Sequence, residues 1–198
     1  APAAGYLTTT TPTLSYNLSD SGATVAVAVD GSTVSLANGE ALALSQGTHV
    51  ITVTATDSAG LVSSSSVTVK VDTVAPTVSL SAPTAGYVTT LNPLLTYSVS
   101  DAGATVVVDV DGSLVAGASG TPLSLTEGTH TITVTASDAA GNVGSASVNV
   151  IVDTTAPTVS ITSPLAGYLT TTTPTLTYSV SDHAATVAVF VDGSPVVA

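Results

Sequence analysis

The sequence predicts an all-β protein built from tandem β-sandwiches. Three observations lead to this prediction: short runs alternate between apolar and polar residues, Asp-Gly and other Gly-containing turn sequences separate the runs, and a long stretch of sequence recurs at a fixed interval. Alternation with a period of two is typical of antiparallel strands with one buried face. No segment shows the period of an amphipathic helix.

Internal repetition sets the domain organisation. The tripeptide Ala-Gly-Tyr begins at residues 4, 85 and 166, so the interval is 85 − 4 = 166 − 85 = 81 residues. Motifs further along the chain return at the same interval without insertion or deletion. We therefore predict three repeats. Repeat 1 covers residues 1–74 and lacks the first strand, repeat 2 covers residues 75–155 and is complete, and repeat 3 covers residues 156–198 and comprises the N-terminal half only.

The strands of repeat 2 follow one another in order along the chain. The residues expected to face inward are Leu95, Tyr97 and Val99, then Val106, Val108 and Val110, then Ile132, Val134 and Ala136, and finally Val148, Val150 and Val152. Turn sequences separate these runs at residues 111–112, 127–128 and 138–142. About seven short strands in one repeat are typical of a β-sandwich.

Composition and charge exclude several classes of function. One Lys or Arg stands against 13 Asp and Glu, for a net charge of −12. Nucleic acid is therefore not an expected partner, because binding to phosphates needs a basic surface. No apolar run approaches the roughly 18 residues of a membrane-spanning helix, so this segment is not expected to insert into a membrane. The absence of Cys and Met suits exposure to oxidants, and we expect an extracellular or cell-surface location.

Two segments carry a resemblance to a known family. Residues 128–142 read GTHTITVTASDAAGN, and residues 152–157 read VDTTAP. This sequence resembles the bacterial Ig-like tandem-repeat domains of large surface adhesins and of extracellular filament or stalk proteins. The resemblance implies tandem immunoglobulin-like Greek-key β-sandwiches in an elongated array, often with Ca²⁺ at the junctions. Similar patterns also occur in spacer modules of extracellular polysaccharide enzymes.

Recurring acidic residues suggest where such Ca²⁺ would bind. The candidate ligands are Asp72 and Asp153 in the linkers, Asp101 and Asp182 in the loop after the Tyr-bearing strand, and Asp138 and Asn142 in the loop before the last strand. In an Ig-like sandwich these three segments share one end of the domain, so the first junction is expected to gather Asp72, Asp101, Asp138 and Asn142. Carboxylate and amide oxygens are the ligands that Ca²⁺ prefers. The alternative is that these residues occupy turns and accept hydrogen bonds from their own backbone.

Other polar and aromatic residues have structural interpretations. Asp30, Asp111 and Asp192 each precede Gly and are interpreted as hairpin-turn residues. His49 and His130 each open an inward-alternating strand, and we expect histidines at the edge of the core that are hydrogen-bonded to the backbone. The tyrosines in the strands are expected in the core, whereas Tyr6, Tyr87 and Tyr168 are expected to pack at the junctions. A glycan-binding role for the latter three is the alternative.

Function is predicted from these absences and from the repetition. The chain has no nucleophile elbow, HExxH motif or phosphate-binding loop, so we expect no enzyme and no catalytic residue. The leading hypothesis is a structural extracellular repeat protein, an adhesin stalk or surface filament, that joins neighbouring repeats or copies of itself end to end. The alternatives are a glycan- or protein-binding Ig-like module and the spacer of an extracellular polysaccharide enzyme.

Overall fold

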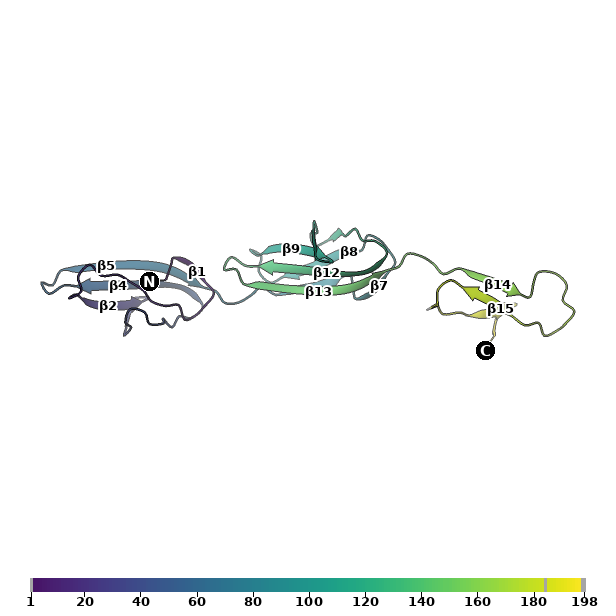
Figure 1. The fold of residues 1–198 in the computed structure, drawn as a ribbon, viewed down its shortest axis with the longest axis horizontal. Helices are drawn as coiled ribbons and strands as arrows, with labels where there is room; N and C mark the ends of the chain where they lie inside the picture. The colour runs from purple at the N-terminus through teal and green to yellow at the C-terminus, as the bar shows by residue number, and fades with distance from the viewer. Residues whose placement is uncertain (1, 184, 197–198) are drawn as a thin grey trace. The chain divides into compact units, whose positions relative to one another are not determined.

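A computed structural model describes residues 2–183 and 185–196 of the chain. Every regular element in these residues is a β-strand, which confirms the predicted all-β class. The chain forms two compact units, Ala1–Val152 and Asp153–Ala198 (Figure 1). No helix among the described residues has the length and hydropathy required to cross a membrane.

Repeat 1 contains one five-stranded sheet. Its strands are β1 (Gly5–Leu7), β2 (Thr24–Val29), β3 (Ser32–Val34), β4 (Gly47–Thr56) and β5 (Val62–Val71), in the spatial order β1-β5-β4-β2-β3. A second layer consists of residues 13–18 and 41–44, which are joined by the isolated bridge between Thr13 and Ala41. Leu14 from this layer and Ile51 from β4 are fully buried in the shared core.

Repeat 2 forms two paired sheets. Its strands are β6 (Val78–Ala82), β7 (Gly86–Val88), β8 (Leu94–Val99), β9 (Thr105–Val110), β10 (Ser113–Val115), β11 (Thr121–Pro122), β12 (Gly128–Ser137) and β13 (Val143–Val152). One sheet has the order β10-β9-β12-β13-β7, and the other has the order β11-β8-β6. The core lies between the two sheets, because it contains Leu95 of β8 together with Ile132 and Val134 of β12.

Long hairpins explain why the alternating sequences fold as they do. In β12 the buried residues Ile132, Val134 and Ala136 occupy every second position, and the intervening threonines remain on the other face. Strand β13 pairs with β12 over its entire length, from Val152 opposite Gly128 to Val143 opposite Ser137. Figure 1 shows these two strands running together along repeat 2.

The Asp-Gly turns are tight hairpins, as the sequence predicts. Asp30 and Asp111 have φ angles of 51° and 54°, and the glycines that follow them have φ angles of 81° and 82°. Two consecutive residues with positive φ are the requirement of a type I′ turn, which Asp-Gly satisfies with little strain. The turns connect β2 to β3 and β9 to β10.

The described residues of the second unit form four short strands. They are β14 (Val159–Ser163), β15 (Thr177–Val180), β16 (Val189–Val191) and β17 (Ser194–Val196), which form the antiparallel pairs β14-β15 and β16-β17. Leu176 and Tyr178, which correspond to core positions of repeat 2, are partly exposed here. The prediction that every strand tyrosine lies in the core therefore fails at Tyr178, whereas Tyr16 and Tyr97 are packed against their cores.

Candidate functional site

Polar residues gather where repeat 1 passes into repeat 2. Thr105 of β9 lies opposite Ser137 of β12, so the loops 101–104 and 138–142 emerge at the same end of repeat 2. The incoming linker reaches this end as well, because Thr77 and Ser100 exchange two hydrogen bonds. The backbone N–H of Thr77 donates to the Ser100 hydroxyl at 2.9 Å, and the backbone N–H of Ser100 donates to the Thr77 carbonyl at 3.0 Å. The predicted convergence of the two loops and the linker is thus present in the structure.

The loop between β12 and β13 is organised by Asp138. One carboxylate oxygen, Oδ1, accepts the backbone N–H groups of Ala140 and Asn142, both at 2.9 Å. The other, Oδ2, accepts a side-chain N–H of Asn142 at 2.9 Å. These hydrogen bonds favour the ionised carboxylate, and the pKa of Asp138 is lowered, chiefly by the Asn142 side chain.

Asn142 also connects the loop to the linker. Its carboxamide nitrogen donates one hydrogen to Asp138 Oδ2 and the other to the backbone carbonyl oxygen of Asp72, the second bond measuring 2.8 Å. Both amide hydrogens are therefore in use. The side chain joins an acidic loop of repeat 2 to a peptide group 70 residues earlier in the chain.

The same linker is bonded to repeat 1. The N–H of Asp72 donates to the carbonyl of Leu7 at 2.9 Å, and the N–H of Thr73 donates to Gln46 Oε1 at 3.2 Å. Gln46 returns a hydrogen bond from Nε2 to the Thr73 hydroxyl. Asp72 is therefore held through its N–H by repeat 1 and through its carbonyl by Asn142 of repeat 2. We call this arrangement the Asp72 joint.

A glycine in β13 completes the Asp72 joint. A Cβ atom placed on Gly144 would overlap the carbonyl oxygen and approach the carbonyl carbon of Pro76. The backbones of Gly144 and Pro76 can approach this closely only because glycine has no side chain. The linker therefore passes directly over the start of β13.

The predicted calcium ligands are brought together only in part. Asp138 and Asn142 are in contact, and Asn142 reaches the backbone of Asp72. The Asp72 and Asp101 carboxylates instead accept backbone N–H groups two residues ahead, from Val74 at 3.3 Å and Gly103 at 2.8 Å. The described residues contain no group of three or more His, Asp or Glu side chains placed to hold a metal ion. Calcium at the junction stays a prediction from sequence.

The two remaining predicted ligands belong to the second unit. Asp153 Oδ1 accepts the N–H of Thr155 at 3.0 Å, and the backbone carbonyl of Asp182 accepts the N–H of Ala185 at 3.3 Å. Both are local turn contacts of the kind that Asp favours.

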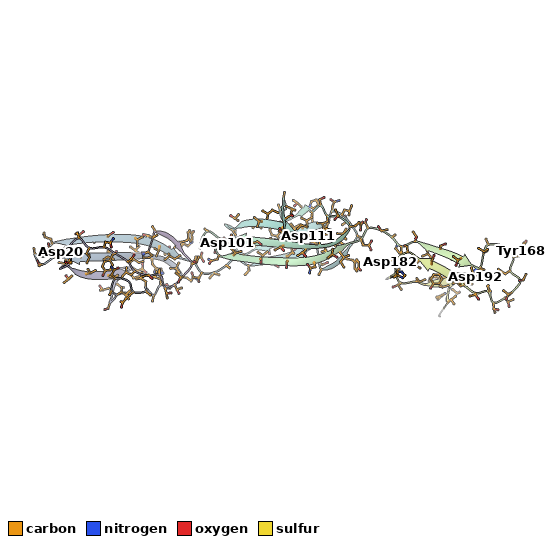
Figure 2. All side chains as sticks on the ribbon, in the orientation of Figure 1. Asp20, Asp101, Asp111, Tyr168, Asp182 and Asp192 are labelled. Atoms are coloured by element: carbon orange, nitrogen blue, oxygen red, sulfur yellow. The ribbon has the colours of Figure 1, made fainter. Side chains whose placement is uncertain are left out.

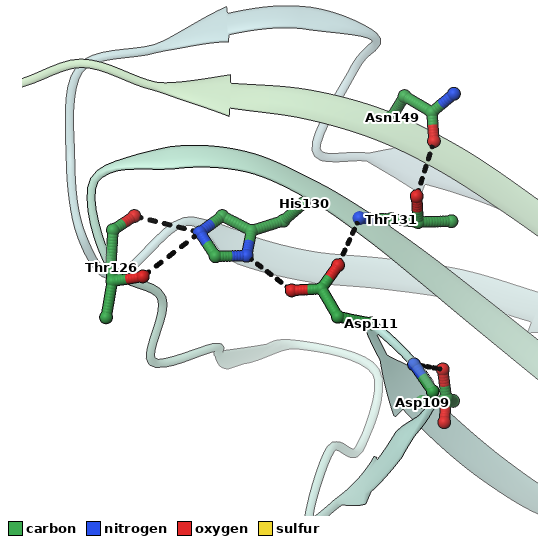
Figure 3. A network of polar contacts seen from close by, with 7 residues as sticks. Asp109, Asp111, Thr126, His130, Thr131 and Asn149 are labelled. Atoms are coloured by element: carbon green, nitrogen blue, oxygen red, sulfur yellow. Dashed lines mark hydrogen bonds and ion pairs between the residues drawn. The ribbon is translucent and has the colours of Figure 1, made fainter.

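A second polar network lies at the opposite end of repeat 2. Figure 3 shows the His130 ring between Asp111 and Thr126. His130 Nδ1 lies 2.7 Å from Asp111 Oδ2, and Nε2 lies 3.0 Å from the Thr126 carbonyl oxygen. The other Asp111 oxygen accepts the N–H of Thr131 at 2.7 Å. The pair ties the β9–β10 turn and the preceding loop to the start of β12.

Both ring nitrogens of this histidine face acceptor oxygens, so only the doubly protonated imidazolium can donate to each. The Asp111 hydrogen bond, followed by the Thr126 carbonyl, accordingly raises the pKa of His130. The Thr131 N–H and then His130 lower the pKa of Asp111.

Repeat 1 contains the same pair. His49 Nδ1 lies 2.7 Å from Asp30 Oδ2, and Nε2 lies 3.0 Å from the Ser45 carbonyl. The Asp30 hydrogen bond raises the pKa of His49. The sequence correctly predicted core-edge histidines bonded to the backbone but missed their carboxylate partners. The signal was present, because Asp and His recur 19 residues apart in both repeats.

The tyrosines after Ala-Gly are exposed within their own repeats. Tyr87 is 71% exposed and Tyr168, labelled in Figure 2, is fully exposed. Packing of these rings at the junctions stays a prediction from sequence. Tyr6 is half-exposed, with the Lys70 ammonium 5.0 Å from its ring centre.

Comparisons with known proteins gave one family match and several similar solved structures. Residues 79–154 match the family model of the bacterial Ig-like domain. A comparison with curated proteins gave no match.

Similar solved structures include fibronectin(III)-like modules of Clostridium thermocellum CbhA, with 24% identity, a TM-score of 0.42 and coverage of 69% of this chain and 82% of that one. Bacteroides ovatus SGBP-B, solved with a mixed-linkage heptasaccharide, has 20% identity, a TM-score of 0.33 and coverage of 74% and 42%. Drosophila N-cadherin EC1-4 has 18% identity, a TM-score of 0.28 and coverage of 68% and 42%. The chain thus matches less than half the length of the last two.

Proposed function

We propose that this chain, of which residues 79–154 match the family model of the bacterial Ig-like domain, is a structural spacer in an extracellular repeat protein. In this proposal the repeats hold other parts of a stalk or filament at a set distance, and no repeat carries catalytic groups. The 81-residue repetition supports the proposal, because near-identical modules in series extend a chain without diversifying its loops.

The Asp72 joint is the observation that carries the proposal. A spacer must resist bending where one domain ends and the next begins, since interdomain motion is the default for linked domains. Here the linker is bonded to repeat 1 through Leu7 and Gln46 and to repeat 2 through Asn142. Both repeats therefore hold Asp72, and repeat 1 also holds Thr73. Calcium ligation by the junction aspartates would add to this stiffness and remains part of the proposal.

Distance distributions between spin labels test the proposed stiffness. The chain contains no cysteine, so labels attach only at introduced sites. Ser32→Cys and Ser113→Cys place one label on β3 and one on β10, at exposed and equivalent positions of repeats 1 and 2. A spacer predicts a single narrow distribution. The control pair, Ser113→Cys with Ser147→Cys, lies within repeat 2 and gives the width expected for a rigid body.

A broad distribution for the pair in different repeats, beside a narrow one for the control pair, would contradict the spacer proposal. Asn142→Leu is expected to broaden the distribution of the pair in different repeats, because it removes the hydrogen bond to the Asp72 carbonyl. The distribution of the control pair within repeat 2 should stay unchanged. Equal widths in the wild type and in this variant would remove the joint as the cause of stiffness.

A second candidate function is glycan binding, favoured by the exposure of Tyr87 and Tyr168. Exposed aromatic rings can stack on sugar faces, as interfacial tyrosines do on other ligands. The chain has no Trp, so a titration with neutral oligosaccharides can be followed by tyrosine fluorescence. Saturable binding that Tyr87→Ala abolishes would favour this candidate over a pure spacer.

A further inference from the structure

Two positions distinguish repeat 2 from repeat 1 where the linker enters. Gly144 lies opposite Ala136 in the β12–β13 pair, and Ser63 lies opposite Ala55 in the β4–β5 pair. The two residues therefore occupy the same place on equivalent hairpins. Because a Cβ on Gly144 would overlap the Pro76 carbonyl, the serine of repeat 1 does not permit a linker to follow the same path.

The second position is that of Asn142, which is Leu61 in repeat 1. The loop itself has the same shape in both repeats, since Asp57 Oδ1 accepts the N–H groups of Ala59 and Leu61 at 2.8 Å. Asparagine is thus not required to form the loop. Leu61 is 71% exposed and has no side-chain donor, so it cannot make the bond that Asn142 makes to the linker carbonyl.

We propose that positions 142 and 144 form a socket that recognises an incoming linker of the Val-Asp-Thr-x-Ala-Pro type. Asparagine supplies the hydrogen bond to the Asp carbonyl, and glycine makes room for the Pro carbonyl. The equivalent residues of repeat 1 reject the same linker. Leu61 has no side-chain donor for the Asp carbonyl, and the Cβ of Ser63 would overlap the Pro carbonyl. The socket residues therefore determine which repeat can follow which.

The second linker has the sequence that the socket recognises. Residues 152–157 read VDTTAP, and residues 71–76 read VDTVAP. By this inference a repeat with Asn and Gly at the socket positions can follow either linker, whereas repeat 1 can follow neither in this geometry. The inference deepens the proposed function, since it identifies the partner of each repeat as a linker of defined sequence.

Hydrogen exchange on the full chain tests the socket. Gly144→Ser and Asn142→Leu each install the residue found in repeat 1. We expect the N–H groups of Asp72, Thr73 and Thr77 to exchange roughly tenfold faster in either variant, the change that loss of about one hydrogen bond produces. The amides of β12 should retain wild-type protection, because repeat 1 shows that the hairpin accepts both substitutions.

Ser63→Gly is the matched control, at the equivalent strand position of repeat 1. It is expected to leave exchange of residues 72–77 unchanged. Two results would overturn the socket: wild-type exchange at these residues in both variants, or an equal rise throughout β12 and β13, which would indicate a distorted strand. These results do not depend on the width of the spin-label distribution, so the socket and the spacer can fail separately.

Discussion

The strand pairs β6–β8 and β14–β15 have the same register and different burial. Val78 lies opposite Val99 in the first pair, as Val159 lies opposite Val180 in the second, and both pairs shift register before the last residue of the leading strand. Yet Leu95 in the first pair is fully buried, whereas its counterpart Leu176 is 39% exposed. Local sequence therefore determines the pairing, and the packing of β12 and β13 determines the burial.

This comparison predicts a large difference between two identical substitutions. Leu95→Ala removes a fully buried side chain, for which destabilisation of about 2–5 kcal/mol is usual. Leu176→Ala removes a side chain that is partly in water already, and we expect less than about 1 kcal/mol. Denaturant titration followed by amide NMR signals of each unit measures both values.

The contrast fails if the two substitutions destabilise their units equally. Such a result would mean that Leu176 is covered in solution as well as Leu95 is. The control is Ser98→Ala, an exposed position in β8 whose replacement should change the stability of repeat 2 by no more than about 0.5 kcal/mol.

The same contrast shows what the sequence could and could not reveal. Alternation of Ile132, Val134 and Ala136 with threonine was sufficient to predict β12, because side-chain direction in a strand depends only on local geometry. The 81-residue period predicts the repeat boundaries in a similar way, since recognising it requires no knowledge of contacts. The exposure of Tyr87 was not predictable in this way, because burial depends on which distant segments cover a residue.

The sequence predicted the location of the Asp72 joint but not the contacts that form it. The sequence placed Asp138, Asn142 and the Asp72 linker at one end of repeat 2, and the structure agrees. It did not reveal that Asn142 binds the backbone of Asp72 or that Gly144 lies beneath the linker. Both contacts involve main-chain atoms, which leave no trace in residue type at the partner position.

A pH titration sharpens the comparison between the units. Asp30 and Asp111 form ion pairs with His49 and His130, and both pairs belong to the first unit. Because the folded-state pKa of His130 is raised, its contribution to stability is complete below the ordinary value near 6.5 and is lost as pH rises through the folded value. We therefore expect the denaturant midpoints of repeats 1 and 2 to decrease as pH rises above the ordinary histidine pKa of about 6.5.

His130→Gln should remove this pH dependence from repeat 2 and leave it in repeat 1, where His49 serves as the internal control. The carboxylate partner acts in the opposite range: the lowered pKa of Asp111 means that its contribution is lost as pH falls below the ordinary value near 3.8. A midpoint that increases as pH rises above about 6.5, or a decrease that His130→Gln leaves intact, would exclude the ion pair as the cause.

The smallest effect is expected from removing calcium. Hydrogen bonds already occupy both amide hydrogens of Asn142 and the Asp138 carboxylate, so a chelator should change the spin-label width of the Asp72 joint little. Acid should change it more, because the lowered pKa of Asp138 implies that its hydrogen bonds persist above the ordinary value and weaken as pH falls through the folded one. If calcium instead narrows the distribution and Asp101→Asn removes that response, the joint binds the ion that the sequence suggested. The aspartates must then rearrange, since the Asp101 carboxylate is bonded to Gly103 in this structure.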